Sequence, residues 1–276
     1  MNTGTPTLLG LPYDLSSSFL RGPARAPQLV REQLWSPATN PWSERGIDLS
    51  VAGRMADAGD LELPEDGAAA RPLIEAGVAA IYSGGGRVIA IGGDHSVTWP
   101  VLRAVGPRFP GITLVHIDAH PDLHDVFEGD RFSHACPFAR ILEEGLVSRL
   151  VQVGIRTMNG HQRGQVERYG VEVIDMPAWA AGLRPRIAGP VYLSLDLDGL
   201  DPSCAPGVSH QEPGGLTTRE ALTLIQGLPG PFVGADVVEY NPLCDLGAAT
   251  ARVAAKLVKE IAARMIETRE VRPVGP

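Results

Sequence analysis

Ligand-type side chains are concentrated in the stretch HIDAHPDLHD, residues 116–125. Within it, Asp118, His120 and Asp122 occupy alternate positions shortly after the apolar run ITLV. Alternate residues of an extended chain lie on one face, so these three side chains can converge where a strand opens into a loop. Carboxylates and imidazoles that converge in this way favour a metal site.

Three other apolar runs end in groups of the same kind. RVIAIGGDHS carries His95, VYLSLDLD carries Asp196 and Asp198, and FVGADVVEY carries Glu239. Because open α/β sheets bind ligands beyond the carboxyl ends of their strands, we expect these groups at one edge. Each close pair of carboxylates would repel by about 4 kcal/mol at about 4 Å, and two cations would relieve that repulsion. Carboxylate-rich ligation with some imidazole and no cysteine favours manganese over zinc.

Hydrophobic periodicity predicts the elements that position these groups. Short runs rich in Val, Ile and Leu predict eight strands, over residues 7–13, 53–61, 87–93, 112–118, 150–156, 171–175, 191–198 and 232–240. Apolar residues three and four apart predict helices over residues 26–34, 67–84, 96–106, 132–145, 217–227 and 249–267. Strands that are apolar on both faces and alternate with helices indicate a mostly parallel sheet covered on both sides. The expected class is a three-layer α/β fold, formed by a single domain over residues 1–276.

Composition narrows the class of partner. The 276 residues are 44% hydrophobic and carry a net charge of −8 without a run of Lys and Arg, which argues against a nucleic-acid surface and for a small-molecule ligand. No apolar run approaches the roughly 18 residues of a membrane span, and the start shows no signal-peptide pattern. The three cysteines are far apart, which suits a reducing compartment. We therefore expect a cytoplasmic protein.

Six motifs follow one another in order: GGDHS (92–96), DAHPD (118–122), SHACPF (133–138), SLDLDGLDP (194–202), EPGGLTTRE (212–220) and DVVEYNP (236–242). With LGLPYDLSSSFLRGP near the start, this succession resembles the ureohydrolase family of arginases and agmatinases over almost the whole chain. The resemblance implies the arginase-type α/β/α fold with an eight-stranded parallel sheet. It also implies a site for two manganese ions, hydrolysis of a guanidino group to urea and an amine, and assembly into trimers or hexamers.

The resemblance further assigns roles to individual residues. It implies that the more buried ion is bound by four side chains, His95, Asp118, Asp122 and Asp196. It implies that the second ion is bound by another four, His120, Asp118, Asp196 and Asp198, so that two aspartates bridge. Asp122 would also hold the attacking water, His134 would protonate the leaving amine as a proton shuttle, and Glu239 would anchor the guanidinium.

The identity of the guanidino substrate is left open by the sequence. His134 argues against formimidoylglutamase, and the acidic, aromatic loop LHDVFEGDRF (123–132) favours a substrate with a positive tail, so agmatine is the first expectation. Arg131 could instead receive a carboxylate, as in 4-guanidinobutyrate or arginine. Two further alternatives are a formimino or amidine C–N hydrolase and a non-catalytic metal-binding assembly protein.

Several other residues near these motifs receive a structural interpretation. We expect His116 and His124 to lie beside the metal ligands rather than among them, and Arg156 to be structural. Cys136 is expected to be a small packing residue. His210, in GVSHQEPGG, departs from the more frequent pattern of the family and could narrow or re-polarise the entrance to the site.

Overall fold

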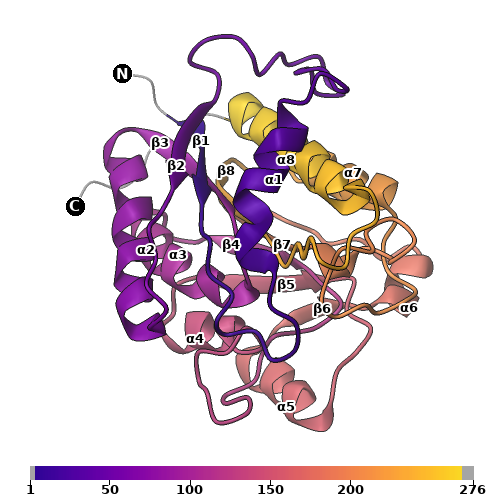
Figure 1. Cartoon of the computed structure of the whole chain (residues 1–276). Coiled ribbons are helices and arrows are strands. Elements are labelled where there is room, and N and C mark those ends of the chain that lie inside the picture. Colours follow the sequence, from indigo (N-terminus) through magenta and orange to yellow (C-terminus); the bar gives the residue numbers. More distant parts are fainter. Residues whose placement is uncertain (1–3, 269–276) are drawn as a thin grey trace.

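The computed structural model describes residues 4–268 of the chain. Its centre is one eight-stranded sheet in which every neighbouring pair of strands is parallel (Figure 1). The spatial order of the strands is β2-β1-β3-β8-β7-β4-β5-β6. The strands are β1 (Thr5–Gly10), β2 (Ala56–Asp60), β3 (Gly86–Ile91), β4 (Thr113–Ile117), β5 (Arg149–Val153), β6 (Glu172–Ile174), β7 (Val191–Asp196) and β8 (Phe232–Val238).

Helices cover both faces of the sheet. The helices are α1 (Ala26–Leu34), α2 (Gly67–Ser83), α3 (Thr98–Val105), α4 (Pro137–Glu143), α5 (Gly160–Tyr169), α6 (Met176–Ala180), α7 (Thr218–Gly227) and α8 (Ala249–Glu267). Apolar side chains of α1, α6, α7 and α8 join one hydrophobic core, and those of α2 to α5 join a second core on the opposite face. Figure 1 shows these two layers of helices with the sheet between them. The fold is therefore the expected three-layer α/β/α arrangement.

The predicted elements agree with the observed ones in kind but not always in extent. Each of the eight predicted strands overlaps an observed strand. The helix predicted over residues 132–145 begins only at Pro137, because residues 132–136 form the turn that carries His134. Helices α5 and α6 were not predicted from the periodicity. The sequence of α5, GHQRGQVERY, buries only two residues, and α6 has five residues, so neither shows an apolar stripe.

The central strands bring the polar motifs to one edge. Strands β3, β8, β7 and β4 are consecutive neighbours, and their residues are buried except Gly86 at the start of β3. The sequence places His95 after β3, Asp118 after β4, Asp198 after β7 and Glu239 after β8. Because the strands are parallel, all four residues lie at the carboxyl edge of the sheet.

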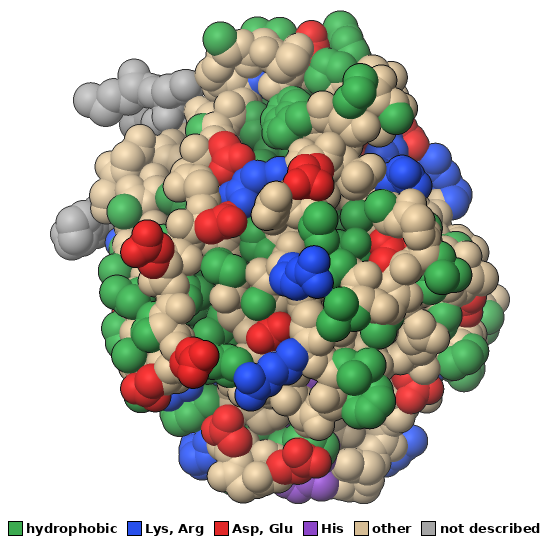
Figure 2. All heavy atoms as spheres, in the orientation of Figure 1, with side chains coloured by type: hydrophobic (Ala, Val, Ile, Leu, Met, Phe, Trp, Pro, Cys, Tyr) green, Lys and Arg blue, Asp and Glu red, His purple; other side chains and the backbone are tan. Residues whose placement is uncertain are grey.

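Charged side chains of both signs occur on the surface. Figure 2 shows a face on which acidic and basic side chains are interspersed, with histidine visible at the lower edge. Within residues 4–268, no helix is both long and apolar enough to cross a bilayer.

Candidate active site

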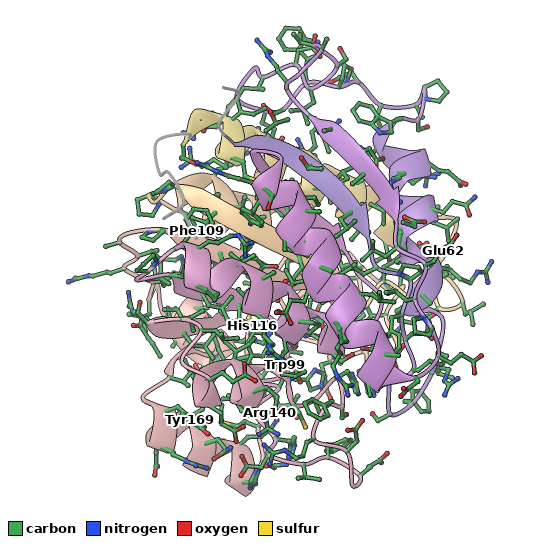
Figure 3. All side chains as sticks on the ribbon, turned by 90° about the vertical axis from the view of Figure 1, so that its left-hand side faces the viewer. Glu62, Trp99, Phe109, His116, Arg140 and Tyr169 are labelled. Atoms are coloured by element: carbon green, nitrogen blue, oxygen red, sulfur yellow. The ribbon has the colours of Figure 1, made fainter. Side chains whose placement is uncertain are left out.

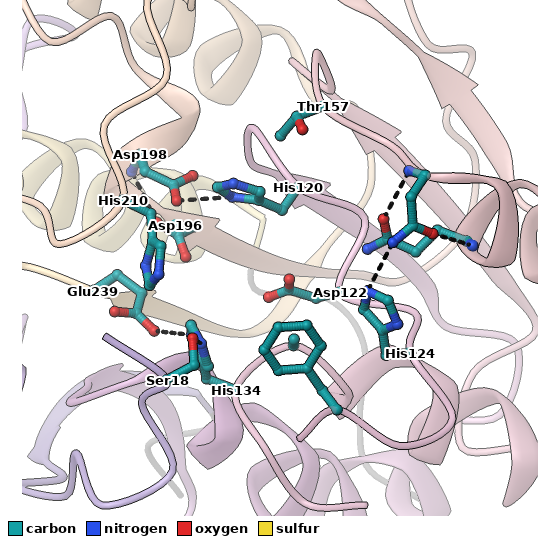
Figure 4. Close-up of a pocket in the computed structure, with 14 residues that line it drawn as sticks. Ser18, His120, Asp122, His124, His134, Thr157, Asp196, Asp198, His210 and Glu239 are labelled. Atoms are coloured by element: carbon teal, nitrogen blue, oxygen red, sulfur yellow. Dashed lines mark hydrogen bonds and ion pairs between the residues drawn. The ribbon is translucent and has the colours of Figure 1, made fainter. Parts of the chain in front are cut away.

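A cavity of about 250 Å³ opens at the carboxyl edge of the sheet. Its floor contains carboxylate and imidazole groups, and Figure 4 shows how they face one another. The residues that line the cavity are Ser18, His120, Asp122, His124, Phe127, His134, Ala135, Thr157, Asn159, Gln162, Asp196, Asp198, His210 and Glu239. His95 and Asp118 lie beneath this floor and are fully buried.

The first group of ligand-type atoms surrounds Nδ1 of His95. This atom lies 3.3 Å from Asp118 Oδ2, 3.0 Å from Asp122 Oδ2 and 3.1 Å from Asp196 Oδ2. It makes no hydrogen bond, although it is buried. The four side chains come from the ends of three strands and form a set that could hold one metal ion.

Hydrogen bonds on the far side of the His95 ring fix its tautomer. Ser194 Oγ and Tyr192 Oη each donate to an oxygen of Asp236, both at 2.7 Å. Because the Ser194 hydroxyl donates its only hydrogen to Asp236, its oxygen accepts from Nε2–H of His95 at 3.0 Å. In the neutral ring, Nδ1 therefore carries a lone pair that faces three carboxylates. That arrangement is stable only with a positive charge between these groups, so these residues fit a metal ion.

A second group surrounds His120 and shares a carboxylate with the first. His120 Nδ1 lies 3.0 Å from Asp198 Oδ2 and 3.4 Å from Asp118 Oδ1. Asp118 therefore belongs to both groups, as expected for a bridging ligand. Asp196 belongs to the first group only, so its bridging role stays a prediction. The two groups together form the buried His and Asp cluster that a binuclear metal site requires.

The ionisation of this cluster shows why cations are needed. Burial, together with the neighbouring charges of Asp198 and Asp118, raises the pKa of Asp196 well above its ordinary range. Burial and the charge of Asp118 likewise raise the pKa of Asp198 to about 7. Burial also opposes a charge on His95, but the surrounding carboxylates raise its pKa well above the ordinary range. Without metal ions, these groups therefore hold protons, and the protons supply the positive charge that the cluster requires.

A buried glutamine connects two of the candidate ligands. Gln152, on β5, donates from Nε2 to the carbonyl oxygen of Pro121 at 2.7 Å and to Nδ1 of His116 at 3.0 Å. Nε2 of His116 must then carry a proton, which it donates to Asp118 Oδ2 at 2.7 Å. His116, labelled in Figure 3, lies on β4, and its ring centroid is 3.9 Å from that of Phe138 in α4. Gln152 therefore positions Asp118 through His116 and holds the turn before Asp122.

His134 and Glu239 form a pair on the side of the cavity floor opposite His120 (Figure 4). His134 Nδ1 lies 3.2 Å from Glu239 Oε1, and the same oxygen accepts from the backbone N–H of His95 at 2.8 Å. Burial opposes a charge on His134, but the hydrogen bond to Glu239 raises its pKa to about 9. Burial also opposes a charge on Glu239, but His134 holds its pKa below the usual range. His134 is therefore a protonated acid at neutral pH.

Two pocket residues have left-handed backbone conformations. Asp122 has φ +50° and Glu239 has φ +64°, a region that residues other than glycine, asparagine and aspartate rarely adopt. Neighbouring backbone hydrogen bonds hold both turns. Glu239 N–H donates to Gly93 O at 2.9 Å, and Asp122 O accepts from Phe138 N–H at 3.3 Å. Asp122 and Glu239 both line the cavity, so these turns direct their carboxylates into it.

The outer part of the cavity is neutral and polar. Thr157, Asn159 and Gln162 line it around the N-terminus of α5, and Figure 4 shows Thr157 on the side opposite His134 and Glu239. His124, which stacks on His161 with 5.3 Å between ring centroids, completes this side. The carboxylates of loop 123–132, Asp125, Glu128 and Asp130, do not line the cavity. Two other residues of that loop, His124 and Phe127, do line it. Arg131 is also outside the cavity and pairs with Glu143 at 3.0 Å.

The structure brings together every predicted site residue and adds several that the sequence did not reveal. The predicted ligands, His134 and Glu239 all lie in or beneath the cavity. Ser18, Gln152 and Ser194 were missed, because a serine or glutamine carries no distinctive spacing. The interpretation of Arg156 as structural agrees with its hydrogen bonds to backbone carbonyls, including that of Asp198 at 2.6 Å.

Comparisons with known proteins agree with this geometry. The Arginase family model matches residues 5–263. Arginase 1, mitochondrial, of Arabidopsis thaliana is 43% identical over 94% of this chain and 80% of its own length. Guanidinopropionase of Pseudomonas aeruginosa is 36% identical over 95% of this chain and 86% of its own length. The structure of arginase from Medicago truncatula superposes with a TM-score of 0.90 at 43% identity, covering 95% of this chain and 88% of that one.

Proposed function

Because this chain belongs to the arginase family, we propose that it hydrolyses a guanidino carboxylic acid to urea and an amine, with L-arginine as its first substrate. Two manganese ions would occupy the cluster of His95, Asp118, His120, Asp122, Asp196 and Asp198. Bound there, divalent cations supply Lewis-acid activation of a water molecule. The observation that carries the proposal is the position of His95 Nδ1, which is buried, makes no hydrogen bond and lies close to three carboxylates.

The residues of the chain perform the remaining steps. Glu239 would accept hydrogen bonds from the planar guanidinium and hold its carbon over the cavity floor. Asp122, which lines the same floor, would orient the attacking water. An amide anion cannot depart, so the leaving nitrogen must receive a proton, and protonated His134 is the acid available on that side.

The proposed substrate differs from the sequence-based preference for agmatine. That preference rested on the negative charge of loop 123–132, but Asp125 instead contacts Arg140 at 3.6 Å and Gln165 at 2.7 Å outside the cavity. The neutral donors Asn159 and Thr157 at the N-terminus of α5 suit a carboxylate better than an ammonium. The named relatives at 43% and 36% identity are an arginase and a guanidinopropionase, both enzymes named for guanidino acids.

A panel of substrates tests the proposal. Purified protein loaded with manganese is incubated with L-arginine, agmatine, 4-guanidinobutyrate and 3-guanidinopropionate, and urea is measured. We expect the highest kcat/KM with L-arginine and loss of urea after chelation. A preference for agmatine would overturn the substrate assignment, whereas ammonia in place of urea would identify an amidine hydrolase. No urea from any compound would overturn the proposed activity.

The alternative of a non-catalytic assembly protein is disfavoured by the His134–Glu239 pair, because a protein that only binds metal needs neither a buried acid nor an anchor. Assembly into a homo-oligomer, a trimer or hexamer, is part of the proposal and is testable by light scattering. Location in the cytoplasm and a single domain over the chain likewise stay predictions.

A further inference from the structure

Both ring nitrogens of His134 are already engaged in the structure. Nδ1 contacts the carboxylate of Glu239 at 3.2 Å, and Nε2 contacts the hydroxyl of Ser18 at 2.8 Å. Glu239 is the proposed anchor of the guanidinium, so the Glu239 carboxylate lies between Nδ1 of His134 and the substrate. Neither nitrogen can reach a leaving group directly without breaking a contact. The one other group in contact with the ring nitrogens that can donate a proton is Ser18 Oγ, which lines the cavity.

The loop that carries Ser18 is fixed in place from two directions. Asp94, a fully buried carboxylate at the end of β3, accepts from the backbone N–H of Ser16 at 2.8 Å. The carbonyl of Ser16 accepts in turn from the backbone N–H of His134 at 3.1 Å. The same loop is therefore tied both to the metal-binding edge and to His134 itself. Backbone contacts of the loop, which do not involve the Ser18 side chain, thus position Ser18 next to the imidazole of His134.

We propose that Ser18 is a catalytic residue that relays the proton from His134 to the leaving nitrogen. As the C–N bond breaks, the Oγ–H bond of Ser18 transfers its hydrogen to that nitrogen. Ser18 Oγ simultaneously receives the hydrogen of His134 Nε2, so the serine ends the step as a neutral hydroxyl. His134 ends it as a neutral imidazole and regains a proton from solvent. This inference rests on the proposed ureohydrolase activity and adds the route of its proton.

The charge state of the pair supports this direction of transfer. Burial opposes a charge on His134, but Glu239 raises its pKa to about 9, so both ring nitrogens carry hydrogens at neutral pH. Nδ1–H then donates to Glu239, and Nε2–H donates to Ser18 Oγ. The hydroxyl hydrogen of Ser18 is thereby left free to point into the cavity. A neutral His134 would allow the opposite arrangement, in which serine donates to Nε2.

The first test removes the hydroxyl. In Ser18→Ala, we expect kcat for urea formation to fall by about 10²-fold, within the range of general acid catalysis, while KM changes little. Ser18→Thr keeps a hydroxyl and should restore most of the activity. Ser17→Ala is the matched control, because the Ser17 hydroxyl contacts Asp94 at 3.5 Å and not His134. Manganese content and Tm of all variants should equal those of the unmodified protein.

The second test separates a relay from an indirect effect. If Ser18 and His134 act in one path, Ser18→Ala should cost nothing further in a His134→Ala background. Rates measured across mixtures of H2O and D2O should curve for the unmodified enzyme, because two hydrogens move together, and become linear in Ser18→Ala. A full kcat in Ser18→Ala, an additive loss in the double variant or a linear dependence in the unmodified enzyme would each overturn the relay. Failure of the proposed activity is distinguishable, because then the unmodified enzyme would release no urea.

Discussion

Two strand segments carry a pair of aspartates, and their surroundings give those carboxylates opposite properties. On edge strand β2, Asp57 and Asp60 are exposed, and both pair with Arg31. At the end of β7, Asp196 and Asp198 are buried beside further carboxylates. Their ion-pair partners among the described residues are histidines, not lysine or arginine. The same residue type therefore forms an ordinary ion pair in one place and requires metal in the other.

The difference shows what burial adds to a local charge pattern. Solvent and a guanidinium satisfy the pair on β2, so no further cation is needed. At the end of β7, desolvation and mutual repulsion push two pKa values upward, and the histidines cannot balance all four aspartates. The metal requirement follows from position in the sheet, because only central strands deliver buried carboxylates to one point.

The largest expected effect comes from breaking the buried pair. Asp196→Asn should lower kcat/KM for urea formation by at least about 10³-fold and reduce the bound manganese, because it removes a carboxylate that faces His95. Asp60→Asn is the matched control and should leave both quantities unchanged. Elemental analysis and a urea assay measure them. Equal losses in both variants would contradict the distinction drawn between the two segments.

Removing the metal should expose the difference without any mutation. If manganese is present at about 100 times its Kd, binding contributes about 2.7 kcal/mol to stability. Chelation should therefore lower Tm by about 5–10 °C. Differential scanning calorimetry measures the shift, and the Asp196→Asn variant should show a much smaller one. An unchanged Tm in the unmodified protein would mean that the cluster binds no metal in the folded state.

A smaller effect is expected from the glutamine beneath the cluster. Gln152→Met removes the donor that orients His116 and the turn at Pro121, so manganese affinity should fall by about 10- to 100-fold. Gln226→Met changes a glutamine whose contacts are with Glu44 and Glu260, and it should leave affinity unchanged. Isothermal titration with manganese compares the two. Equal affinities would show that Asp118 needs no support from β5.

Glu239 provides an intermediate case, because it is buried but its histidine partner, His134, is not shared with a second carboxylate among the ion pairs of the described residues. The raised pKa of His134 means that the pair stabilises the fold below the ordinary histidine value of 6.5, and that this contribution is lost as pH rises through about 9. Urea formation should decline over the same alkaline range. Glu239→Gln removes the largest contribution that raises the pKa of His134, so this pKa should fall. An NMR titration of the ring measures this, and a value still near 9 would show that another group holds the proton.

The smallest effect belongs to the exposed pair. Arg31→Ala breaks both contacts on β2, but the partners are 39% and 40% exposed and screened by water. We expect a loss of less than about 1 kcal/mol in the free energy of unfolding, and none in metal content. Urea denaturation measures the first quantity. A loss of several kcal/mol in the free energy of unfolding would contradict the distinction between the exposed and the buried aspartates.

The parts of the site predicted from sequence are those with a distinctive chemical type and spacing. His95, Asp118 and Asp198 end apolar strands, and parallel pairing then dictates that they meet. Ser18 and Gln152 could not be recognised, because their roles depend on which loop or strand lies opposite them. The charge of loop 123–132 did not indicate which side chains line the cavity. Its carboxylates do not line the cavity, because the direction in which a side chain points is a tertiary property.

The left-handed turns at Asp122 and Glu239 also bear on attempts to make this protein more thermostable. Glycine would adopt this backbone conformation without strain, but it would remove a buried carboxylate that lies against His95 or His134. The same change would remove a proposed metal ligand in the first case and the proposed substrate anchor in the second. Stability and activity therefore select the same side chains at these two turns, and the backbone conformation is the cost of keeping them.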